Sequence, residues 1–324
     1  MVGVSVVAQR GKRWLPALRV VATVVMLAVA VRWVHVGSLL PAWHASTIGW
    51  LAGALACTML GILLSAIRWQ RVLVAMDLPA KLSTLLSAYL AGQFVSNFLP
   101  STIGGDVLRV TRLSASNGET TGTFASVVLD RMSGWLILPI LCLVGLAINP
   151  SLIHLGRASR LAVAISLVTL ASLGAVLAVA ASPRLGGRLA GHDGWLRFAG
   201  AVHLGLDRLR HRPAAAAGVL ATGFVYQLAV ISAAVLGARA LDLDIGPTAL
   251  LAFIPAVAIV QVLPFTVGGL GVREGALALF LQPLGVSVTH AVALGLLVYA
   301  LHLVASLLGA PAFAIGNRAG RTTA

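Results

Sequence analysis

Residues 99–109 read LPSTIGGDVLR, and residues 263–273 read LPFTVGGLGVR, 164 positions further along the chain. The two strings match without a gap at Leu, Pro, Thr, both Gly and Arg, which is six of eleven positions. An apolar composition alone does not place Pro, a Gly pair and Arg in register, so the repeat indicates two related structural elements. Each string should break a helix, because Pro removes a backbone donor and Gly-Gly weakens helical continuation.

The chain around these strings has the composition of a membrane protein. Of its 324 residues, 59% are hydrophobic and only 10% are charged, whereas about a quarter of the residues in a soluble domain are charged. Apolar runs near 20 residues recur, and this length matches the ~30 Å hydrocarbon thickness of a bilayer. The sequence therefore predicts an all-α polytopic membrane protein, with residues 1–324 in one integral membrane domain. Full spans are expected at about 17–34, 48–67, 122–148, 161–181, 214–238 and 289–316.

The distribution of Lys and Arg predicts how the chain crosses the membrane, because cytoplasmic loops carry the excess of these residues. If the two motif regions are re-entrant hairpins, at about 82–113 and 247–283, then 17 of the 23 Lys and Arg residues lie on the cytoplasmic side, Arg68 and Arg109 among them. If the first arm crossed completely, the loop 182–212 with its six Arg residues would lie outside. In the re-entrant model, both termini are cytoplasmic. The hairpins enter from opposite sides as an inverted repeat, which is how many transporters build a central site.

Three segments leave alternatives open. The first arm is only about 25 Å long at 1.5 Å per residue, so its start, KLSTLLSA, can lie along the membrane interface. The N-terminal segment can mimic a cleavable signal peptide. The basic loop 182–212 reads either as an amphipathic helix on the cytoplasmic leaflet or as a loop that only sets topology. The net charge of +14 fits an anionic membrane surface and gives no reason to expect nucleic acid.

Six charged residues fall within the predicted hairpins and the VVLDRMSG helix. They are Asp106, Arg109, Asp130, Arg131, Arg273 and Glu274. Each charge at the bilayer centre costs about 2.5 to 3.5 kcal/mol, so these residues are expected to pair, face water or lie near the interface. Asp106 and Arg109 are three apart and can pair on one helix face. The other two pairs are adjacent in sequence and point in different directions, so each residue is expected to find a partner on another element. This predicts one polar centre joining both hairpins and the VVLDRMSG helix, and a substrate pathway is favoured over a purely structural ion-pair network.

The Gly pairs suggest what such a centre would bind. A helix that restarts after Gly-Gly has unsatisfied amide groups and a partial positive charge at its start. Two such helix starts, with Arg109 and Arg273 nearby, suit a phosphate group; the alternative is a turn needed only for tight packing. GGLGVREG lacks the Lys-Ser/Thr of a P-loop, so nucleotide binding is not expected. The His residues have no metal-ligand spacing, and Cys57 and Cys142 lie in apolar runs, so no metal or cofactor is expected.

At these motifs the sequence resembles the lysylphosphatidylglycerol synthase transmembrane family, a flippase-like membrane region that also occurs as stand-alone proteins. The resemblance rests on NFLPSTIGGDVLR at 97–109, LDRMSG at 129–134 and LPFTVGGLGVREGAL at 263–277. Family membership implies movement of a lipid or lipid-linked phosphate between leaflets. The large soluble C-terminal domain that carries aminoacyl transfer in the full synthases is absent from this sequence, so the chain is not expected to be the synthase itself. The substrate-binding positions that the resemblance implies are Asn97, Gly104, Gly105, Asp106, Arg109, Asp130, Arg131, Gly268, Gly269, Arg273 and Glu274, with Pro100, Pro264 and Gly271 as further motif positions.

The leading hypothesis is a lipid flippase in the plasma (inner) membrane that moves an anionic phospholipid or a polyprenyl-phosphate-linked lipid between leaflets. Its expected partners are membrane lipids with anionic head groups, and a homo-oligomer is also considered. One alternative is a membrane-embedded transferase that uses Asp106, Asp130 or Glu274 as a base. Another is a non-transporting partner of a cell-envelope synthase. The absence of a catalytic motif favours a protein that is not an enzyme.

Overall fold

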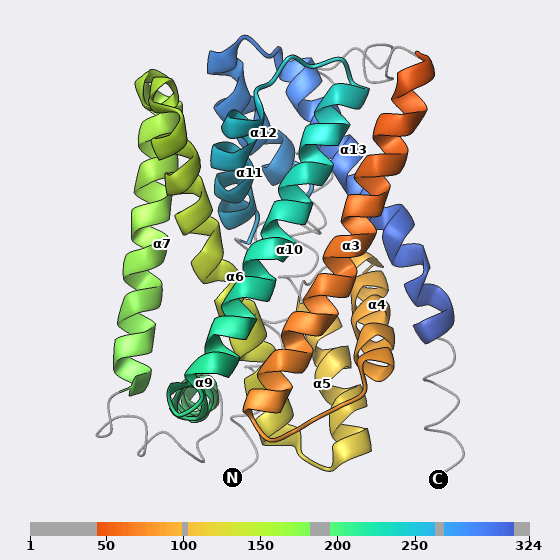
Figure 1. Cartoon of the computed structure of the whole chain (residues 1–324), viewed down its shortest axis with the longest axis vertical. Coiled ribbons are helices and arrows are strands. Elements are labelled where there is room, and N and C mark those ends of the chain that lie inside the picture. The colour runs from red at the N-terminus through yellow and green to blue at the C-terminus, as the bar shows by residue number, and fades with distance from the viewer. Residues whose placement is uncertain (1–43, 99–102, 182–194, 263–268, 314–324) are drawn as a thin grey trace, which may run out of the picture.

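Long helices that run the length of the molecule form its frame (Figure 1). The computed structural model describes residues 44–98, 103–181, 195–262 and 269–313, and within these ranges it contains helices and no β-strand. Five helices of this part are long and apolar enough to cross a membrane. They are α3 (Ala45–Ala75), α6 (Thr120–Ile148), α7 (Arg157–Ala181), α10 (Pro213–Ala240) and α13 (Val288–Leu307). The all-α polytopic fold is therefore confirmed.

Two shorter helical hairpins pack within this frame and come from opposite ends of the molecule (Figure 1). The first hairpin consists of α4 (Leu82–Phe98) and α5 (Ile103–Asn117), and the second of α11 (Pro247–Gln261) and α12 (Val272–Leu281). At 1.5 Å per residue, α4 and α11 are about 25 and 22 Å long, roughly half the length of α3. The turns 99–102 and 263–268 lie outside the described residues. The opposed directions of the hairpins match the inverted repeat expected from the doubled string.

The predicted spans agree with the frame helices except at some boundaries. The span expected at 17–34 lies outside the described residues. Helix α3 continues to Ala75 instead of ending near residue 67, because residues beyond Arg68 are still buried by neighbouring helices. Helix α13 ends at Leu307 rather than near residue 316. A further helical turn at 309–313 follows it, and Gly309 packs against the backbone of Leu90 in α4 with no room for a side chain.

The segment KLSTLLSA, which can lie along the membrane interface, is helical except for Lys81. From Leu82 onward it belongs to α4, which runs as one helix to Phe98. The physical reason is packing, because Leu85 and Ala88 are buried in a cluster with Trp69 and Leu73 of α3. The first arm is therefore helical almost from its start.

The Gly pairs behave differently in the two hairpins. Gly104 and Gly105 lie in the first turn of α5. A methyl group on Gly105 would meet the backbone of Gly92 in α4, with the carbonyl carbon at 3.0 Å, so the first pair allows close helix contact. In the second hairpin Gly269 and Gly271 have φ of +73° and +84°. These left-handed conformations favour glycine, and α12 starts only after them.

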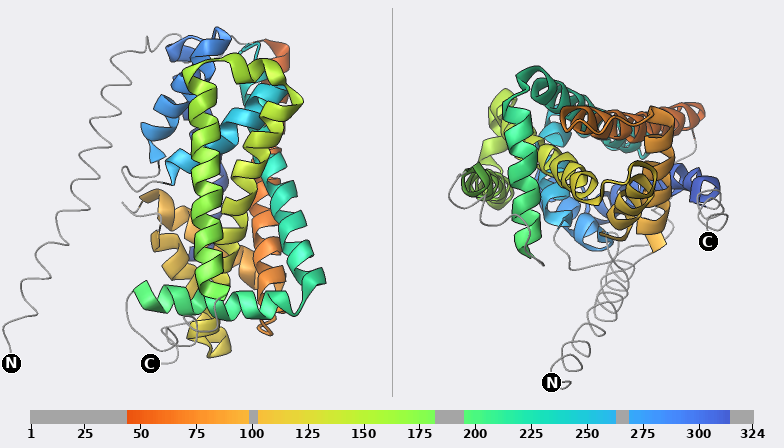
Figure 2. Two further views of the ribbon diagram at one scale, coloured as in Figure 1. Left: turned by 90° about the vertical axis from the view of Figure 1, so that its left-hand side faces the viewer. Right: turned by 90° about the horizontal axis from the view of Figure 1, so that it is seen from below.

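The predicted loop 182–212 contains a helix, α9 (Trp195–Arg210), which lies across one end of the bundle (Figure 2). Residues 182–194 lie outside the described part. Arg212, just after α9, forms an ion pair of 2.7 Å with Asp77 and donates to the Val74 carbonyl at 3.1 Å. Arg208 of α9 donates to the Met76 carbonyl. The segment is thus helical, as the amphipathic interpretation expected, and its basic side chains cap the end of α3.

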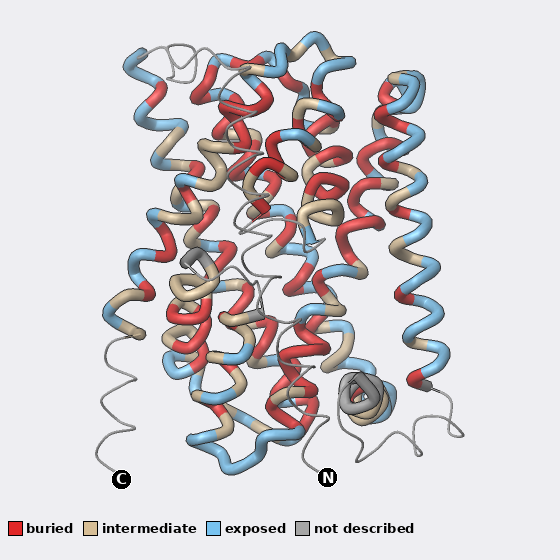
Figure 3. Tube along the Cα trace, turned by 180° about the vertical axis from the view of Figure 1, so that it is seen from behind, coloured by how far each residue is buried: buried red, intermediate tan, exposed pale blue. Residues whose placement is uncertain are grey.

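Buried residues line the inside of the bundle, and exposed ones cover its outer faces (Figure 3). Much of the exposed surface is apolar: Leu167 and Val168 of α7 are 54% and 67% exposed. Apolar outward faces on long helices are what lipid contact requires. Two short 3₁₀ helices, η2 (Pro150–His154) and η4 (Gln282–Leu284), belong to the connections at the end opposite α9 (Figure 1).

Candidate functional site

A buried carboxylate, Asp130 of α6, lies between two guanidinium groups from other helices. Arg68 of α3 donates from Nε to Oδ1 at 2.8 Å, and Arg109 of α5 donates from Nη2 to Oδ2 at 2.9 Å. The three side chains are 5% exposed or less. Asp130 is about 15 Å along α6 from Thr120 at 1.5 Å per residue, so the charges are well inside the bundle. Their mutual attraction offsets part of the desolvation cost that each would otherwise carry.

A second carboxylate extends this group toward the surface. Arg131 of α6 donates to both oxygens of Asp106 in α5, from Nε at 2.9 Å and from Nη2 at 3.0 Å. Arg109 also contacts Asp106, from Nη1 at 3.3 Å. The side chains of Asp106 and Arg131 are 21% and 48% exposed, so this pair forms the accessible edge. We call these five residues the Asp130 cluster: Arg68, Arg109, Arg131, Asp106 and Asp130.

Aromatic rings fix the orientation of the arginines. The guanidinium carbon of Arg109 lies 4.2 Å from the ring centroid of Trp69 and 4.6 Å from that of Tyr89. Tyr226 of α10 lies under Arg68 at 5.3 Å. The Trp69 indole is itself held, because its N–H donates to Ser126 at 3.0 Å. Cation–π contacts of this kind stabilise a desolvated cation and hold its plane.

The Asp130 cluster has more positive than negative charge. Three arginines face two aspartates, which leaves one positive charge. Within the described ranges, Arg68 Nη1 and Arg109 Nε are also buried without a hydrogen-bond partner. A buried donor without a partner costs about 1 to 3 kcal/mol. Excess charge and spare donors together make the cluster suited to an anion.

The second hairpin has its own ion pair, Arg273 and Glu274, which we call the Glu274 pair. Glu274 accepts from Arg273 Nε at 3.1 Å and from the Gly271 backbone N–H at 2.6 Å, so the carboxylate caps the start of α12. The two side chains are only 8% and 1% exposed. Arg273 lies over the Tyr299 ring at 5.0 Å, and its Nη2 has no hydrogen-bond partner in the described part of the chain.

Several predicted pairings are confirmed and one is wrong. Asp106 does pair with Arg109, and both Asp130 and Arg131 find partners on other helices. Arg273 and Glu274 do not find partners on other helices, because they bond to each other. Both lie in the first turn of α12, which begins directly after Gly271 with its positive φ. The single polar centre joining both hairpins is therefore not found: none of the ion pairs between described residues joins the Asp130 cluster to the Glu274 pair.

The remaining predicted site residues are four glycines and Asn97. Gly104 and Gly105 start α5, immediately before Asp106. Gly269 is buried, and a side chain there would collide with Gln261 at the end of α11. Asn97 lies in the last turn of α4, and nothing is described of its side chain. Gly268 lies outside the described residues.

Arg68 was missed by the sequence reading. It was counted with the cytoplasmic charges, although it is 4% exposed and bonded to Asp130. Two glycines make room for it, since a methyl on Gly134 would lie 2.9 Å from Arg68 Nη1 and one on Gly223 would lie 3.3 Å from its Cδ. The available signal is the apolar run VLVAM at residues 72–76, which extends the helix beyond Arg68 and Arg71 and so places Arg68 inside it.

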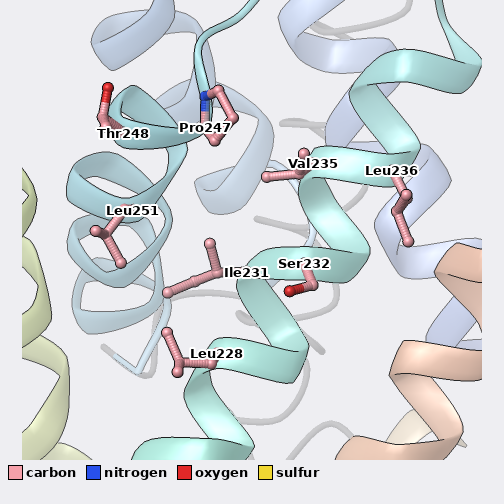
Figure 4. Close-up of a pocket in the computed structure, with 8 residues that line it drawn as sticks. All are labelled: Leu228, Ile231, Ser232, Val235, Leu236, Pro247, Thr248 and Leu251. Atoms are coloured by element: carbon pink, nitrogen blue, oxygen red, sulfur yellow. The ribbon is translucent and has the colours of Figure 1, made fainter.

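An apolar groove lies apart from these charges. It has a volume of about 400 Å³ and lies between α10 and α11 (Figure 4). Its lining is almost wholly apolar, and Ser232 and Thr248 supply its hydroxyl groups. A similar groove of about 280 Å³ lies between α6 and α10. Such surfaces fit acyl chains better than head groups. Among the described residues, no group of three or more His, Cys, Asp and Glu side chains could hold a metal ion.

Five long apolar helices, two half-length hairpins and a buried charged cluster define a multi-pass membrane protein with a polar interior. The family described as "Lysylphosphatidylglycerol synthase TM region" matches residues 17–309. The chain belongs to this family of membrane-embedded proteins, which are involved in lipid handling. No curated protein and no solved structure matches it.

Proposed function

We propose that the protein is a lipid flippase that moves an anionic phospholipid or a polyprenyl-phosphate-linked lipid between leaflets. The observation that carries this proposal is the Asp130 cluster, which holds one uncompensated positive charge at the inner part of the first hairpin. Ionisable groups at membrane depth are costly and generally mark a substrate or ion pathway. A phosphate would supply the missing negative charge there.

The fold supports a route through the membrane. The two hairpins enter from opposite ends, so the start of α5 and the start of α12 both lie in the interior (Figure 1). Each helix start offers amide groups and a partial positive charge to an anion. We propose that the head group passes along the hairpins from the Asp130 cluster toward the Glu274 pair, while the acyl chains stay in the lipid beside the outer grooves.

Purified protein in vesicles tests the proposal. The vesicles contain a fluorescent phosphatidylglycerol in both leaflets, and a membrane-impermeant reductant quenches the outer one. A flippase makes the inner fluorescence accessible, without chemical change of the lipid. Arg131→Gln should slow this exchange, and Arg239→Gln is the matched control, because Arg239 is a half-exposed arginine at the other end of the bundle.

The same vesicles separate the two alternatives. A modified lipid, detected by mass spectrometry, would support a membrane-embedded transferase in which a carboxylate acts as base. Neither exchange nor modification would support a non-transporting partner of a cell-envelope synthase. Exchange that is equal in protein-free vesicles would reject the flippase.

We also propose a plasma-membrane location with the α9 end in the cytoplasm. The described basic residues gather at that end, among them Arg71, Lys81, Arg210 and Arg212, and cytoplasmic loops carry such an excess. Single cysteines at exposed positions 210 and 157 test this in intact cells, in a background without Cys57 and Cys142. Labelling of position 157 alone from outside is expected. Labelling of both from the same side would overturn the topology.

A further inference from the structure

The carboxylate of Asp106 binds Arg131 with the same two-point geometry that an arginine uses for phosphate. Arg131 donates to its two oxygens at 2.9 and 3.0 Å, and Arg109 adds a third contact at 3.3 Å. Carboxylate and phosphate both accept from the planar guanidinium fork through two parallel bonds. A phosphate group could therefore take these donors only if Asp106 released them.

The position of Asp106 in its helix is also one that favours a bound anion. It lies in the first turn of α5, directly after Gly104 and Gly105. Backbone amides at a helix start are unsatisfied, and the helix dipole stabilises a negative charge there. The start of α5 therefore favours a negative charge at the place that Asp106 occupies.

Asp106 is more exposed than Asp130, the other carboxylate of the cluster. Asp130 is 1% exposed and has two arginine partners, whereas Asp106 and Arg131 are 21% and 48% exposed. Displacement of Asp130 would leave two buried arginines without a counter-charge, whereas the Asp106–Arg131 pair is accessible to a ligand from the surface. The Asp106–Arg131 contact is therefore the part of the cluster that can open while the contacts of Asp130 with Arg68 and Arg109 remain.

A buried donor points to the ligand that would replace Asp106. Arg109 is 3% exposed, and its Nε has no hydrogen-bond partner in the described structure. Release of Asp106 would free Arg109 Nη1 as well. The two oxygens of Asp106 already contact both arginines, and a phosphate group has more acceptor atoms to offer to the same donors.

We infer that Asp106 is an internal anion that holds the phosphate position of the Asp130 cluster, and that a lipid phosphate binds by displacing it from Arg131. This inference rests on the proposed function. It adds that Asp106 pairs with Arg131 when no lipid phosphate is bound. The ligand chemistry is a phosphate ester with a free anionic oxygen. Asp106 would then set the affinity of the site, so that the bound lipid can leave again.

The test is a binding titration of the purified full-length protein in detergent with dioctanoyl phosphatidylglycerol. Asp106→Asn removes the competing charge and keeps the side-chain size, so the affinity should rise at least tenfold. The matched control is Asp207→Asn, which removes the same charge from an exposed position on α9 and should leave the affinity unchanged. The double variant Asp106→Asn/Arg131→Gln should lose the gain, because it lacks the arginine that Asp106 occupied.

Each outcome decides the inference. An unchanged or weaker affinity in folded Asp106→Asn would overturn it, and so would an equal gain in Asp207→Asn, which would be a general charge effect. Asp106→Ser provides a second variant, and failure of both to fold would identify Asp106 as a structural anchor. A parallel titration with inorganic phosphate tells a free-phosphate site from a lipid head-group site, since tighter binding of phosphate alone would exclude the lipid.

The outcome is independent of the vesicle assay. Tighter binding in Asp106→Asn without lipid exchange by the wild type would reject the flippase and keep the internal anion. Lipid exchange by the wild type without tighter binding in Asp106→Asn would support the flippase and reject the internal anion.

Discussion

The arginine of the first hairpin, Arg109, forms an ion pair with another helix, whereas that of the second, Arg273, forms one with the next residue in the chain. Arg109 contacts Asp130 of α6 and lies between rings of α3 and α4. Arg273 contacts Glu274, the next residue in α12. The two arginines occupy the same place in the doubled string and yet have unlike surroundings.

The cause is local backbone geometry. Helix α5 starts at Ile103, so Arg109 is its seventh residue. Helix α12 starts at Val272, after two glycines with positive φ, so Arg273 is its second residue. A side chain two turns into a helix can reach other helices, whereas one at the start lies beside the capping groups. An identical register in sequence therefore does not give an identical position in the fold.

The hairpins also differ in how they are attached to the frame. The second packs into a large apolar core that includes Phe253 of α11 and Phe280 of α12, whose rings stack with centroids 5.3 Å apart. The first relies on the ion contacts of the Asp130 cluster together with a smaller apolar cluster. Apolar packing is insensitive to an added anion, whereas ion pairs exchange partners. The first hairpin is therefore the one expected to respond to a phosphate.

The largest effect is expected from Asp130→Asn. This change leaves Arg68 and Arg109 buried without their shared counter-charge, and the loss of one partner from a buried pair costs about 3 to 5 kcal/mol. The melting temperature should fall sharply and recover in part when Arg68→Met is added. The same rescue with Arg273→Met would contradict the separation of the two hairpins.

Glu274→Gln should have a smaller effect on stability. The amide oxygen still accepts from the Gly271 N–H, so the cap at the start of α12 survives and only the charge of the Arg273 contact is lost. Hydrogen bonds to charged groups contribute about 1.5 to 3 kcal/mol, and a loss of that size is expected in thermal unfolding. A loss as large as that of Asp130→Asn would mean that the Glu274 pair also supports other elements.

Gly105→Ala tests the close contact inside the first hairpin. The new methyl group would meet the Gly92 backbone, and overpacking of this kind costs about 1 to 3 kcal/mol. The control is Gly275→Ala in α12, where nothing lies within 4 Å of the added carbon. This second change should stabilise slightly, because alanine favours a helix by about 1 kcal/mol over glycine. Equal melting temperatures for the two variants would exclude the close contact.

The smallest expected effects are those of Arg109→Lys and Arg273→Lys on lipid exchange in vesicles. Lysine keeps the charge but loses the planar fork that binds two oxygens. Each variant should slow exchange at least tenfold, which is ~1.4 kcal/mol, with the protein still folded. Activity lost in proportion to the melting temperature would assign both arginines to structure. A loss in Arg109→Lys alone would restrict phosphate binding to the first hairpin.

Composition and charge were enough to predict the class of fold and the opposed hairpins. The apolar runs are long enough to cross a bilayer, and the distribution of Lys and Arg predicts at which end of the bundle each loop lies. Spacing was also enough for Asp106 with Arg109, because residues three apart share a helix face. It was not enough for Arg273 with Glu274, whose contact depends on the φ of Gly271. Nor could it place Arg68, because a partner 62 positions away is set by how α3 and α6 pack.

The contact between α3 and α10 has a mechanical consequence. Glycines on both helices bring them together at successive levels: Leu236 lies against Gly53, Tyr226 against Gly61, Arg68 against Gly223 and Arg71 against Gly218. From Gly53 to Arg71 this seam is about 27 Å long at 1.5 Å per residue. Small residues give close backbone approach and dense packing along its whole length. We therefore expect the two helices to move as one body, and the proposed lipid movement would require other elements to slide or tilt against them.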